Sequence, residues 1–315
     1  MSASFASALT AASDAAARQH YPQGTLYVVA TPIGNLADIT LRALHVLQRA
    51  DAIACEDTRH TQALLRAYGI DKPADRLLAV HQHNEAQAAQ AVVERLQASQ
   101  RIAYVSDAGT PGVSDPGARL VAAVHAAGLR CIPLPGASSV TSALSVAGAV
   151  ATTPDAGGFL FAGFLPTKSA ERTAAVQRLA AEPRSVLLLE APHRILDLAQ
   201  ALAVLGERRV TLARELTKQF EEVSTHAASA LAAWLQEAPQ RVKGEFVVLL
   251  HPVAVARDNG AEADRVLRLL LAELPVKSAV RLAAEITGAP RNALYERGLQ
   301  IRNQDDDTTG TAGQS

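Results

Sequence analysis

The feature that most constrains the fold is a regular alternation of short apolar runs and helical patterns between residues 24 and 150. The first run, at 26–30, is β-prone and ends in a Pro/Gly turn, after which Leu41, Leu44 and Leu47 show helical spacing. Similar apolar runs follow at 52–55, 77–80, 102–105 and 131–134, with helical stretches between them. Such βα alternation predicts a mostly parallel sheet covered by helices.

The remaining chain predicts a second α/β domain and a helical extension. Strand-like runs at 159–163, 185–190, 210–214 and 245–250 alternate with helical patterns, after a Thr/Pro/Gly-rich stretch at 152–158 that resembles a hinge. Helical periodicity returns at 262–274, 278–287 and 291–300. The expected organisation is an N-terminal α/β domain at 24–150, a C-terminal α/β domain at 151–256 and a helical extension at 257–302, flanked by disordered tails at 1–23 and 303–315.

Charge and targeting patterns narrow the class of protein. The formal net charge of −1 argues against a surface that is basic throughout, so any binding of nucleic acid must be local. The N-terminus has no basic start or continuous apolar core, and no stretch approaches the roughly 20 apolar residues that cross a bilayer. Cys55 and Cys131 lack metal-ligand spacing and are expected to be buried free thiols. These features predict a cytoplasmic protein without a membrane anchor.

Loops rich in Gly, Pro and small polar residues follow the predicted strands, where open parallel sheets bind ligands. The loop at 31–35 lacks both the P-loop ending and GxGxxG, so phosphate binding is unsupported. In the loop at 106–117, Asp107 is suited to the amine of an amino acid, and Gly109 permits close approach of a ligand. Asp115 is expected to cap the next helix. Ser138 and Ser139 either cap a helix or also meet a ligand at its N-terminus.

Together these residues resemble the tetrapyrrole-methylase superfamily and, within it, the ribosomal RNA small-subunit methyltransferase I family, over about residues 24–299. The resemblance rests on the blocks TPIGNLADIT (31–40), CEDTRHT (55–61), VSDAGTP (105–111) and GFLP (163–166). Further blocks are EAPHR (190–194), ARELTK (213–218) and KGEF (243–246), most of which tetrapyrrole methylases lack. The long Ala/Ser-rich N-terminus and the residues beyond Gln300 depart from the family pattern without touching a motif.

The resemblance implies 2′-O-methylation of a cytidine in 16S rRNA, with S-adenosylmethionine held in a cleft between the domains. It also implies a homodimer, with the RNA or the assembled small ribosomal subunit as partner. The positions that match the family's cofactor contacts are Pro32, Ile33, Gly34, Asp107, Ala108, Gly109, Thr110, Pro111, Pro135, Gly136, Ser138, Ser139, Glu190, Leu216 and Gly244.

Methyl transfer from a sulfonium needs mainly alignment with the ribose oxygen and removal of a proton. We expect Asp57 to handle the substrate or its proton and Arg59 to meet RNA phosphate; a helix cap with a solvated Arg59 is the alternative. His83 can accept a proton near neutral pH and Asn84 can orient a ribose, although Asn84 fits an N-cap equally well. His81 and His83 have no evident third ligand, so no metal site is expected.

Two further charged sets have open interpretations. In the second domain, charged residues fit either an interdomain network of salt bridges or contact with RNA: Glu190, His193, Arg194, Arg214, Glu215 and Lys218. The C-terminal helical segments carry basic residues that either bind RNA or lie on a solvent-exposed face among acidic residues: Arg265, Arg268, Lys277, Arg281, Arg291 and Arg297.

Two other functions remain open on the sequence. A small-molecule methylase acting on a tetrapyrrole carbon would share the cofactor cleft but would need a wide apolar trough in place of the polar residues 57–60. A non-catalytic ribosome-assembly factor would bind RNA through the C-terminal helices and would not bind S-adenosylmethionine.

Overall fold

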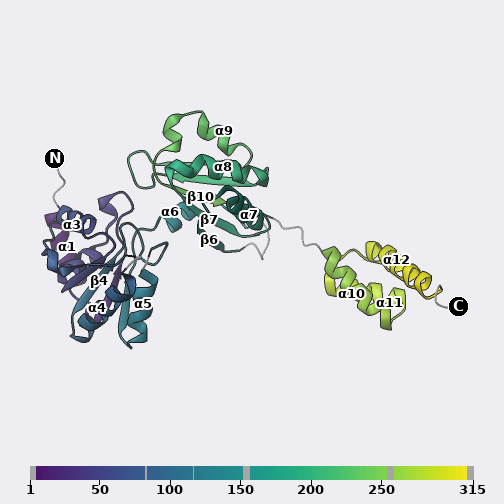
Figure 1. Ribbon diagram of the computed structural model, residues 1–315, viewed down its shortest axis with the longest axis horizontal. Coiled ribbons are helices and arrows are strands. Elements are labelled where there is room, and N and C mark those ends of the chain that lie inside the picture. The colour runs from purple at the N-terminus through teal and green to yellow at the C-terminus, as the bar shows by residue number, and fades with distance from the viewer. Residues whose placement is uncertain (1–4, 82–83, 116, 152–156, 254–258, 311–315) are drawn as a thin grey trace. The chain divides into compact units, whose positions relative to one another are not determined.

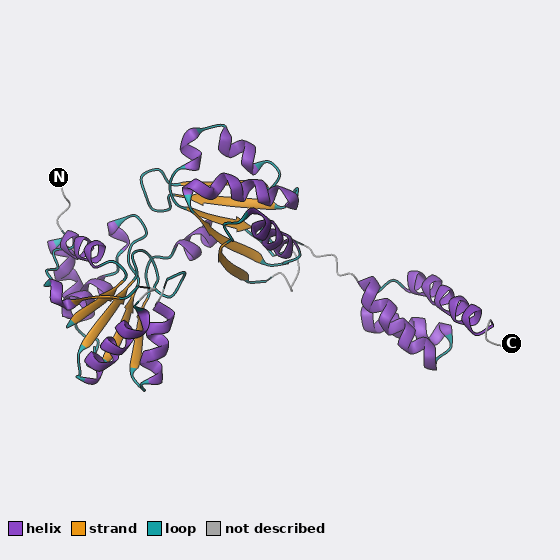
Figure 2. Cartoon of the chain, in the orientation of Figure 1, coloured by secondary structure: helices purple, strands orange, loops and turns teal. Residues whose placement is uncertain are grey.

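The computed structural model describes residues 5–81, 84–115, 117–151, 157–253 and 259–310 of the 315-residue chain. The chain divides into two compact units, Met1–Val253 and Ala254–Ser315. The first unit holds two five-stranded sheets, and the second holds helices. Figure 1 gives the element labels, and Figure 2 shows the strands of the first unit flanked by helices.

The first sheet confirms the parallel arrangement predicted from βα alternation. Its order is β3-β2-β4-β1-β5, and every neighbouring pair runs parallel. Its strands are β1 (Thr25–Val29), β2 (Ala52–Cys55), β3 (Leu77–Ala79), β4 (Arg101–Val105) and β5 (Arg130–Leu134). The connecting helices are α2 (Leu41–Arg49), α3 (Thr58–Ala67), α4 (Glu85–Gln97) and α5 (Gly117–Ala126), with short 3-10 turns at Leu36–Asp38 and Ala74–Arg76.

Alternate residues of these strands face two different cores. Tyr27 and Val29 pack into one apolar cluster with residues of α2, whereas Leu26, Ile102 and Tyr104 pack into a second with residues of α4 and α5. Both faces of the sheet are therefore covered, which explains why its strands read as nearly continuous apolar runs.

Helices α2 and α5, which follow the neighbouring strands β1 and β4, pack on opposite faces of the parallel sheet. Two neighbouring strands whose connections pass to opposite faces form a switch point, which leaves a crevice at the carboxyl ends of the strands. The loops that follow β1 and β4 are the Gly/Pro-containing loops at 31–35 and 106–117 of the sequence.

The N-terminal segment is ordered from Phe5 onward, so the disorder predicted for residues 1–23 is wrong for the described part. Helix α1 (Ala6–Ala16) packs on α2, with Ala12 and Ala16 buried in the first core. Phe5 makes an edge-on contact with Tyr68, with ring centroids 5.0 Å apart. Small alanines four residues apart form a narrow stripe that allows close helix packing, so a segment without large apolar residues still orders.

The second sheet is mixed and has the order β6-β7-β10-β8-β9. Strands β6 and β7 pair in parallel, and the other neighbouring pairs are antiparallel. The strands are β6 (Phe159–Phe164), β7 (Ser185–Glu190), β8 (Arg209–Arg214), β9 (Glu222–Ala227) and β10 (Phe246–Leu250). One face is covered by α7 (Ser169–Ala180), α8 (Ile195–Leu202) and α9 (Leu231–Gln236), with 3-10 turns at Pro192–Arg194, Ala203–Leu205 and Pro239–Val242.

Helix α6 (Ser139–Val146) covers the other face of this second sheet. Its buried residues Val140 and Ala143 pack with Leu187, Val247 and Leu249. The N-terminal domain predicted at 24–150 includes this helix, since it follows β5 directly. Its apolar packing nevertheless lies with the second sheet.

The C-terminal unit contains α10 (Asn259–Glu273), α11 (Val276–Thr287) and α12 (Arg291–Gly310) around a core that includes Leu267, Val280 and Leu294. Helix α12 continues through residues 303–310, where disorder was predicted, while 311–315 lie outside the described residues. No helix among the described residues is long and apolar enough to cross a membrane.

Several basic residues of this unit pair with acids, as the solvated-face interpretation expects. Arg265 bonds Glu262 at 2.7 Å, Arg281 lies 3.3 Å from Glu285, and Asp264 accepts from Arg297 at 2.8 Å. Asp264 also lies 3.9 Å from Arg268, whereas Lys277 and Arg291 are exposed.

Candidate cofactor and substrate site

The loops after β1 and β4 are joined by backbone hydrogen bonds. The Thr31 N–H donates to the Gly109 carbonyl at 2.9 Å, and the Gly109 N–H donates to the Thr31 carbonyl at 3.1 Å. The Thr31 hydroxyl also donates to the Ser106 carbonyl at 3.3 Å. Gly109 has φ +80°, and a Cβ there would lie 3.3 Å from Cγ2 of Ile33. The switch-point crevice is therefore bordered by two loops fixed to one another, with glycine required at the crossing.

Asp115 organises the end of the β4 loop. Its carboxylate accepts the Gly112 N–H and the Gly117 N–H, both at 2.8 Å, and the Tyr104 hydroxyl at 3.3 Å. The bond to Gly117, the first residue of α5, confirms the predicted helix cap. Asp115 is thus a structural residue that fixes the loop carrying Asp107 and Gly109.

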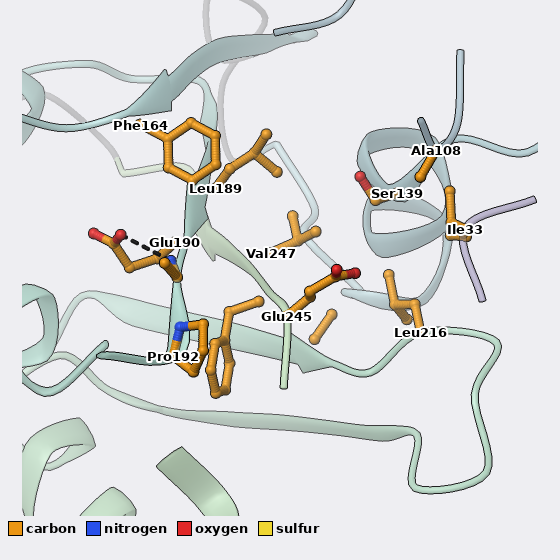
Figure 3. A pocket seen from close by; sticks show the side chains of 13 residues that line it. Ile33, Ala108, Ser139, Phe164, Leu189, Glu190, Pro192, Leu216, Glu245 and Val247 are labelled. Atoms are coloured by element: carbon orange, nitrogen blue, oxygen red, sulfur yellow. Dashed lines mark hydrogen bonds between the residues drawn. The ribbon is translucent and has the colours of Figure 1, made fainter. Parts of the chain in front are cut away.

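A pocket of about 440 Å³ lies where these loops meet the uncovered part of the second sheet, beside α6 (Figure 3). Its volume falls within the roughly 300–1,000 Å³ typical of small-molecule sites. The lining is mostly apolar and comes from both α/β regions: Ile33, Ala108, Ser139, Phe164, Leu189, Glu190, Ala191, Pro192, Ala213, Leu216, Glu245, Phe246 and Val247. Of the positions matched to cofactor contacts, the pocket contains Ile33, Ala108, Ser139, Glu190 and Leu216.

The other matched positions lie in the same loops but do not line the pocket. Pro32, Gly109 and Pro111 are buried, and the Thr110 hydroxyl donates to the Ala137 carbonyl at 3.0 Å. Gly136 lies against Ala30, where a Cβ would come within 2.9 Å of the Ala30 Cβ. The remaining members are partly or fully exposed: Gly34, Asp107, Pro135, Ser138 and Gly244.

Sequence reasoning missed most of the wall provided by the second sheet. Leu189 and Ala213 each pair with Val247 across neighbouring strands, so the three side chains share one face. The other missed lining residues are Phe164, Ala191, Pro192, Glu245 and Phe246. The strand alternation carried a usable signal, since residues 187, 213, 247 and 249 form one period-2 apolar face, but only the strand pairing shows that α6 leaves part of it uncovered.

Glu190 differs from its neighbours on the pocket wall. In Figure 3 its carboxylate points away from Ile33 and Ser139, whereas Leu189 lies on the side facing them. Its Oε1 accepts the Ala191 N–H at 2.9 Å and lies 3.1 Å from Nε of Arg194, and the side chain is fully buried. Its Oε2 has no hydrogen-bond partner among the described residues. Glu190 therefore fixes the backbone of the wall, and its carboxylate is directed away from the N-terminal loops.

Acidic residues meet at the carboxyl ends of β2 and β4. Glu56 Oε1 accepts the Asp107 N–H at 3.2 Å, and Asp107 Oδ1 accepts the Asp57 N–H at 3.3 Å. Burial, with further repulsion from Asp107 and Asp115, raises the pKa of Glu56 above its ordinary value, although the Asp107 N–H opposes this. The loop after β2 is thus tied directly to the loop after β4.

Asp57 caps helix α3, as the alternative interpretation expected. Its Oδ1 accepts the N–H groups of Arg59 at 2.8 Å and His60 at 3.3 Å, and these bonds lower its pKa. The Arg59 side chain is 92% exposed and lies 3.5 Å from Asp57 Oδ2. A cap leaves Arg59 accessible to an anion, so the two interpretations are compatible.

Asn84 occupies the N-cap position of α4 without a capping side-chain bond. Its Oδ1 accepts the His81 N–H at 2.9 Å, and its Nδ2 donates to the Ala79 carbonyl at 3.0 Å. The amide therefore braces the loop that leaves β3. His83 lies outside the described residues, and its expected role stays a prediction.

The charged residues of the second domain form pairs within that domain, so the predicted interdomain network of salt bridges is wrong for the pairs seen here. Arg214 pairs with Glu222 at 3.0 Å, and Lys218 Nζ pairs with Glu215 at 2.9 Å and Glu245 at 3.1 Å. Contact with the N-terminal loops is made by packing, because Gly34 lies directly against the Lys218 side chain.

Comparison with known proteins agrees with this architecture. Residues 25–232 match the family model of tetrapyrrole (corrin/porphyrin) methylases, and residues 257–302 match the RsmI C-terminal HTH domain. Cobalt precorrin-4 methyltransferase superposes with a TM-score of 0.53 at 18% identity, over 74% of this chain and 98% of that chain. Diphthine synthase gives a TM-score of 0.54 at 14% identity, over 72% and 90%. These structures share the fold and confirm the predicted class of two α/β domains.

Sequence relatives cover nearly the whole chain. The protein named ribosomal RNA small subunit methyltransferase I from Escherichia coli O157:H7 is 50% identical over 281 residues, covering 88% of this chain and 96% of the relative. The protein of the same name from Pseudomonas aeruginosa is 46% identical over 282 residues, covering 88% and 97%. The chain therefore belongs to the tetrapyrrole methylase family and, within it, to the ribosomal RNA small subunit methyltransferase I proteins.

Proposed function

We propose that this chain transfers the methyl group of S-adenosylmethionine to the ribose 2′-oxygen of a cytidine in 16S rRNA. The observation that carries the proposal is the pocket of about 440 Å³ at the switch point of the parallel sheet, closed by the second sheet. Family membership supports methyl transfer, and the names of the relatives support small-subunit ribosomal RNA as the substrate.

The residues present fit this cofactor. Leu189, Leu216 and Val247 provide an apolar wall suited to a nucleobase, and the small side chains of Ala108 and Ser139 leave room opposite it. The exposed carboxylate of Asp107 is suited to the cationic amine of the methionine part. We propose that the fifteen positions matched to the family's cofactor contacts act through both side chains and backbone groups of these loops.

S-adenosylmethionine supplies an electrophilic sulfonium methyl, so the chain's own residues need mainly to align the substrate and hold its proton. Arg59, exposed at the start of α3, is our proposed contact for RNA phosphate. Asp57 is a poor proton acceptor because capping bonds lower its pKa, so we propose that it positions the substrate through α3. Asn84 positions the β3 loop, where His83 is the proposed proton acceptor.

We further propose a cytoplasmic homodimer that acts on 16S rRNA or on the assembled small subunit. The match of residues 257–302 to an HTH domain supports a nucleic-acid contact by the C-terminal unit. A net charge of −1 supports recognition shared with an assembled partner rather than binding by charge alone.

The proposal is tested by mapping 2′-O-methylation on small-subunit RNA from cells that lack the protein. Loss of one cytidine methylation, restored by the purified enzyme with labelled S-adenosylmethionine, is the expected result. An unchanged methylation map would overturn the RNA assignment. Labelling of a tetrapyrrole instead would establish the small-molecule alternative, and failure to bind S-adenosylmethionine in calorimetry would establish the non-catalytic one.

Arg59→Ala tests the proposed phosphate contact. We expect the KM for RNA to rise by roughly threefold to tenfold with an unchanged melting temperature, because one phosphate contact is lost from an exposed side chain. Arg66→Ala is the matched control, since Arg66 is exposed in the last turn of the same helix. Equal KM values for the two variants would remove Arg59 from the RNA site.

A further inference from the structure

The turn that follows β8 has an unusual backbone. Glu215 and Thr217 have φ angles of +51° and +65°, in the left-handed region that residues other than glycine rarely adopt. Between them lies Leu216, which is 9% exposed and lines the pocket. A strained backbone persists only where surrounding contacts fix it, and such strain gathers at functional sites.

Three charged side chains fix this turn. Glu215 Oε1 accepts Lys218 Nζ and the Glu245 N–H, both at 2.9 Å, and Lys218 Nζ also lies 3.1 Å from Glu245 Oε2. The Glu215 N–H donates to the Glu245 carbonyl at 3.0 Å. Gly244, with φ +92°, has no space for a Cβ because the Glu215 side chain occupies it. We call Glu215, Lys218 and Glu245 the charged latch.

The charged latch contacts the loop that follows β1. A Cβ on Gly34 would overlap Cγ of Lys218 and would lie 3.0 Å from its Cε and 3.1 Å from the Thr217 hydroxyl. The side chain of Lys218 therefore crosses the backbone of Gly34 along its methylene groups, while its ammonium group is held by the two glutamates.

This contact separates two cavities. Ile33 and Leu216 line the pocket of about 440 Å³, whereas the adjacent residues Gly34, Thr217 and Lys218 line a second cavity of about 700 Å³. Along both segments, consecutive residues face different cavities. The Gly34–Lys218 contact thus forms the partition between them.

We propose that the charged latch holds the β1 loop against the second wall of the pocket and so positions Ile33 and Leu216 around the bound cofactor. Lys218, Glu215 and Glu245 are positioning residues in this scheme, and Gly34 is the surface against which Lys218 closes. The inference rests on the proposed function, because it takes the pocket to be the S-adenosylmethionine site.

The charge states of the latch support this role. Burial opposes ionisation of Glu215, but hydrogen bonds from Lys218 and the Glu245 N–H outweigh it and lower the pKa. Burial likewise opposes the charge on Lys218, and hydrogen bonds to Glu215 and Glu245 outweigh it and raise the pKa. Arg214 adds a favourable charge next to Glu215. Both shifts favour the charged forms of Glu215 and Lys218, as their ion pair requires.

A double-mutant cycle tests the partition. Gly34→Ala, Lys218→Ala and the double variant are compared with the wild type for S-adenosylmethionine binding by calorimetry and for thermal unfolding. We expect Gly34→Ala to weaken binding by about tenfold or more through its overlap with Lys218, and Lys218→Ala to weaken it by roughly fivefold. The double variant should bind no more weakly than Lys218→Ala, because removing the lysine removes the overlap.

Two further measurements separate positioning from a general structural role. The KM for S-adenosylmethionine should rise in Lys218→Ala while kcat at saturating cofactor stays near that of the wild type, and Lys218→Arg should restore most of the affinity. Lys168→Ala, which removes an exposed lysine paired with Glu171 at 3.1 Å, is the matched control and should leave binding unchanged.

Additive losses in the cycle, or unchanged binding in Lys218→Ala, would overturn the latch. A wild-type protein that does not bind S-adenosylmethionine would contradict the proposed function instead. In that case the unfolding cycle of the free protein still measures whether residues 34 and 218 are coupled, so the two failures are distinguishable.

Discussion

The two walls of the pocket are held in place by different kinds of interaction. The first wall, from the parallel sheet, is fixed by backbone bonds between Thr31 and Gly109 and by the carboxylate of Asp115. The second wall, from the mixed sheet, is fixed by the charges of Glu215 and Lys218 around a strained turn. The paired backbone bonds between Thr31 and Gly109 involve no ionised group, whereas the ion pair of Glu215 and Lys218 in the second wall is screened by salt.

The difference follows from strand direction. All the strands of the parallel sheet end at one edge, so the loops that carry the first wall are neighbours by topology. In the mixed sheet, the ends of β7 and β8 meet the start of the antiparallel β10, where Phe246 pairs with both Glu190 and Arg214. The turn after β8 has backbone bonds from the Glu215 N–H to the Glu245 carbonyl and from the Lys218 N–H to the Glu215 carbonyl, and the ion pair of Glu215 and Lys218 adds to them.

The largest effect is expected from Gly109→Ala in the first wall. Gly109 and Gly112 have φ angles of +80° and +87°, but a Cβ meets Ile33 at 3.3 Å only at the former, while the latter faces open space. We expect Gly109→Ala to lower the free energy of unfolding by about 2–3 kcal/mol and to weaken cofactor binding at least tenfold. Gly112→Ala, the matched control, should lose only about 1 kcal/mol. Equal losses in urea unfolding would show that the contact with Ile33 contributes nothing.

Asp115→Ala is expected to have the next largest effect, because the β4 loop loses its carboxylate anchor. Two backbone N–H groups and the Tyr104 hydroxyl lose an acceptor, which predicts a loss of about 1–3 kcal/mol in unfolding free energy. Asp75→Ala, at an exposed aspartate, serves as the control. A stability change no larger than that of the control would mean that the backbone pair between Thr31 and Gly109 holds the first wall alone.

Glu215→Gln tests the second wall and is expected to have a smaller effect, which depends on pH. The pKa of Glu215 is lowered in the folded protein, so its charged form stabilises the fold at neutral pH. This stabilisation is lost as the pH falls below the ordinary pKa of a glutamate and through the lowered pKa of the folded state. We expect the variant to be less stable by about 1 kcal/mol at pH 7, with the difference shrinking toward pH 4. Urea unfolding at several pH values measures this. A difference that does not change with pH would indicate a packing effect rather than a charge effect.

The smallest effect is expected from Glu56→Gln, with the opposite sign. Burial and the neighbouring Asp107 raise the pKa of Glu56, so its charge at neutral pH destabilises the folded protein. We expect the variant to gain a few tenths of a kcal/mol at pH 7, and this gain should vanish at low pH, where the glutamate is already neutral. A loss of stability at pH 7 would show that Glu56 helps to hold the first wall rather than straining it.

Much of the first wall followed from the sequence. The apolar runs predicted the parallel strands, and the position of each Gly/Pro loop after a strand predicted where the loops converge. The alternation of strand-like and helical stretches was sufficient to locate these loops, because parallel strands place the loops after them at the same edge of the sheet. Helix α1 was missed because its packing relies on Ala12 and Ala16, residues that carry little apolar signal.

The second wall was largely inaccessible to sequence reasoning. Strand β9 was missed because it lies at the edge of the sheet and its residues are mostly half-exposed and polar. Gly34 and Lys218 are in contact although they lie far apart in the chain. The spacing of apolar residues around either position does not predict this contact. The sequence identified the charged residues of the second domain, such as Arg214, Glu215 and Lys218. It did not predict their partners, because strand pairing decides which charges lie close together, and the salt bridges formed within one domain.

Helix α6 has a consequence for building chimaeric methyltransferases. The chain enters α6 through residues 135–138, and the helix packs with Leu187 and Val247 of the second sheet. An exchange of modules at the Thr/Pro/Gly-rich stretch of 152–158 would therefore pair the helix of one parent with the sheet of the other and mismatch their apolar surfaces. A crossover just after β5 keeps helix and sheet from the same parent, so the useful cutting point lies in the loop leading into α6 rather than in the more obvious linker.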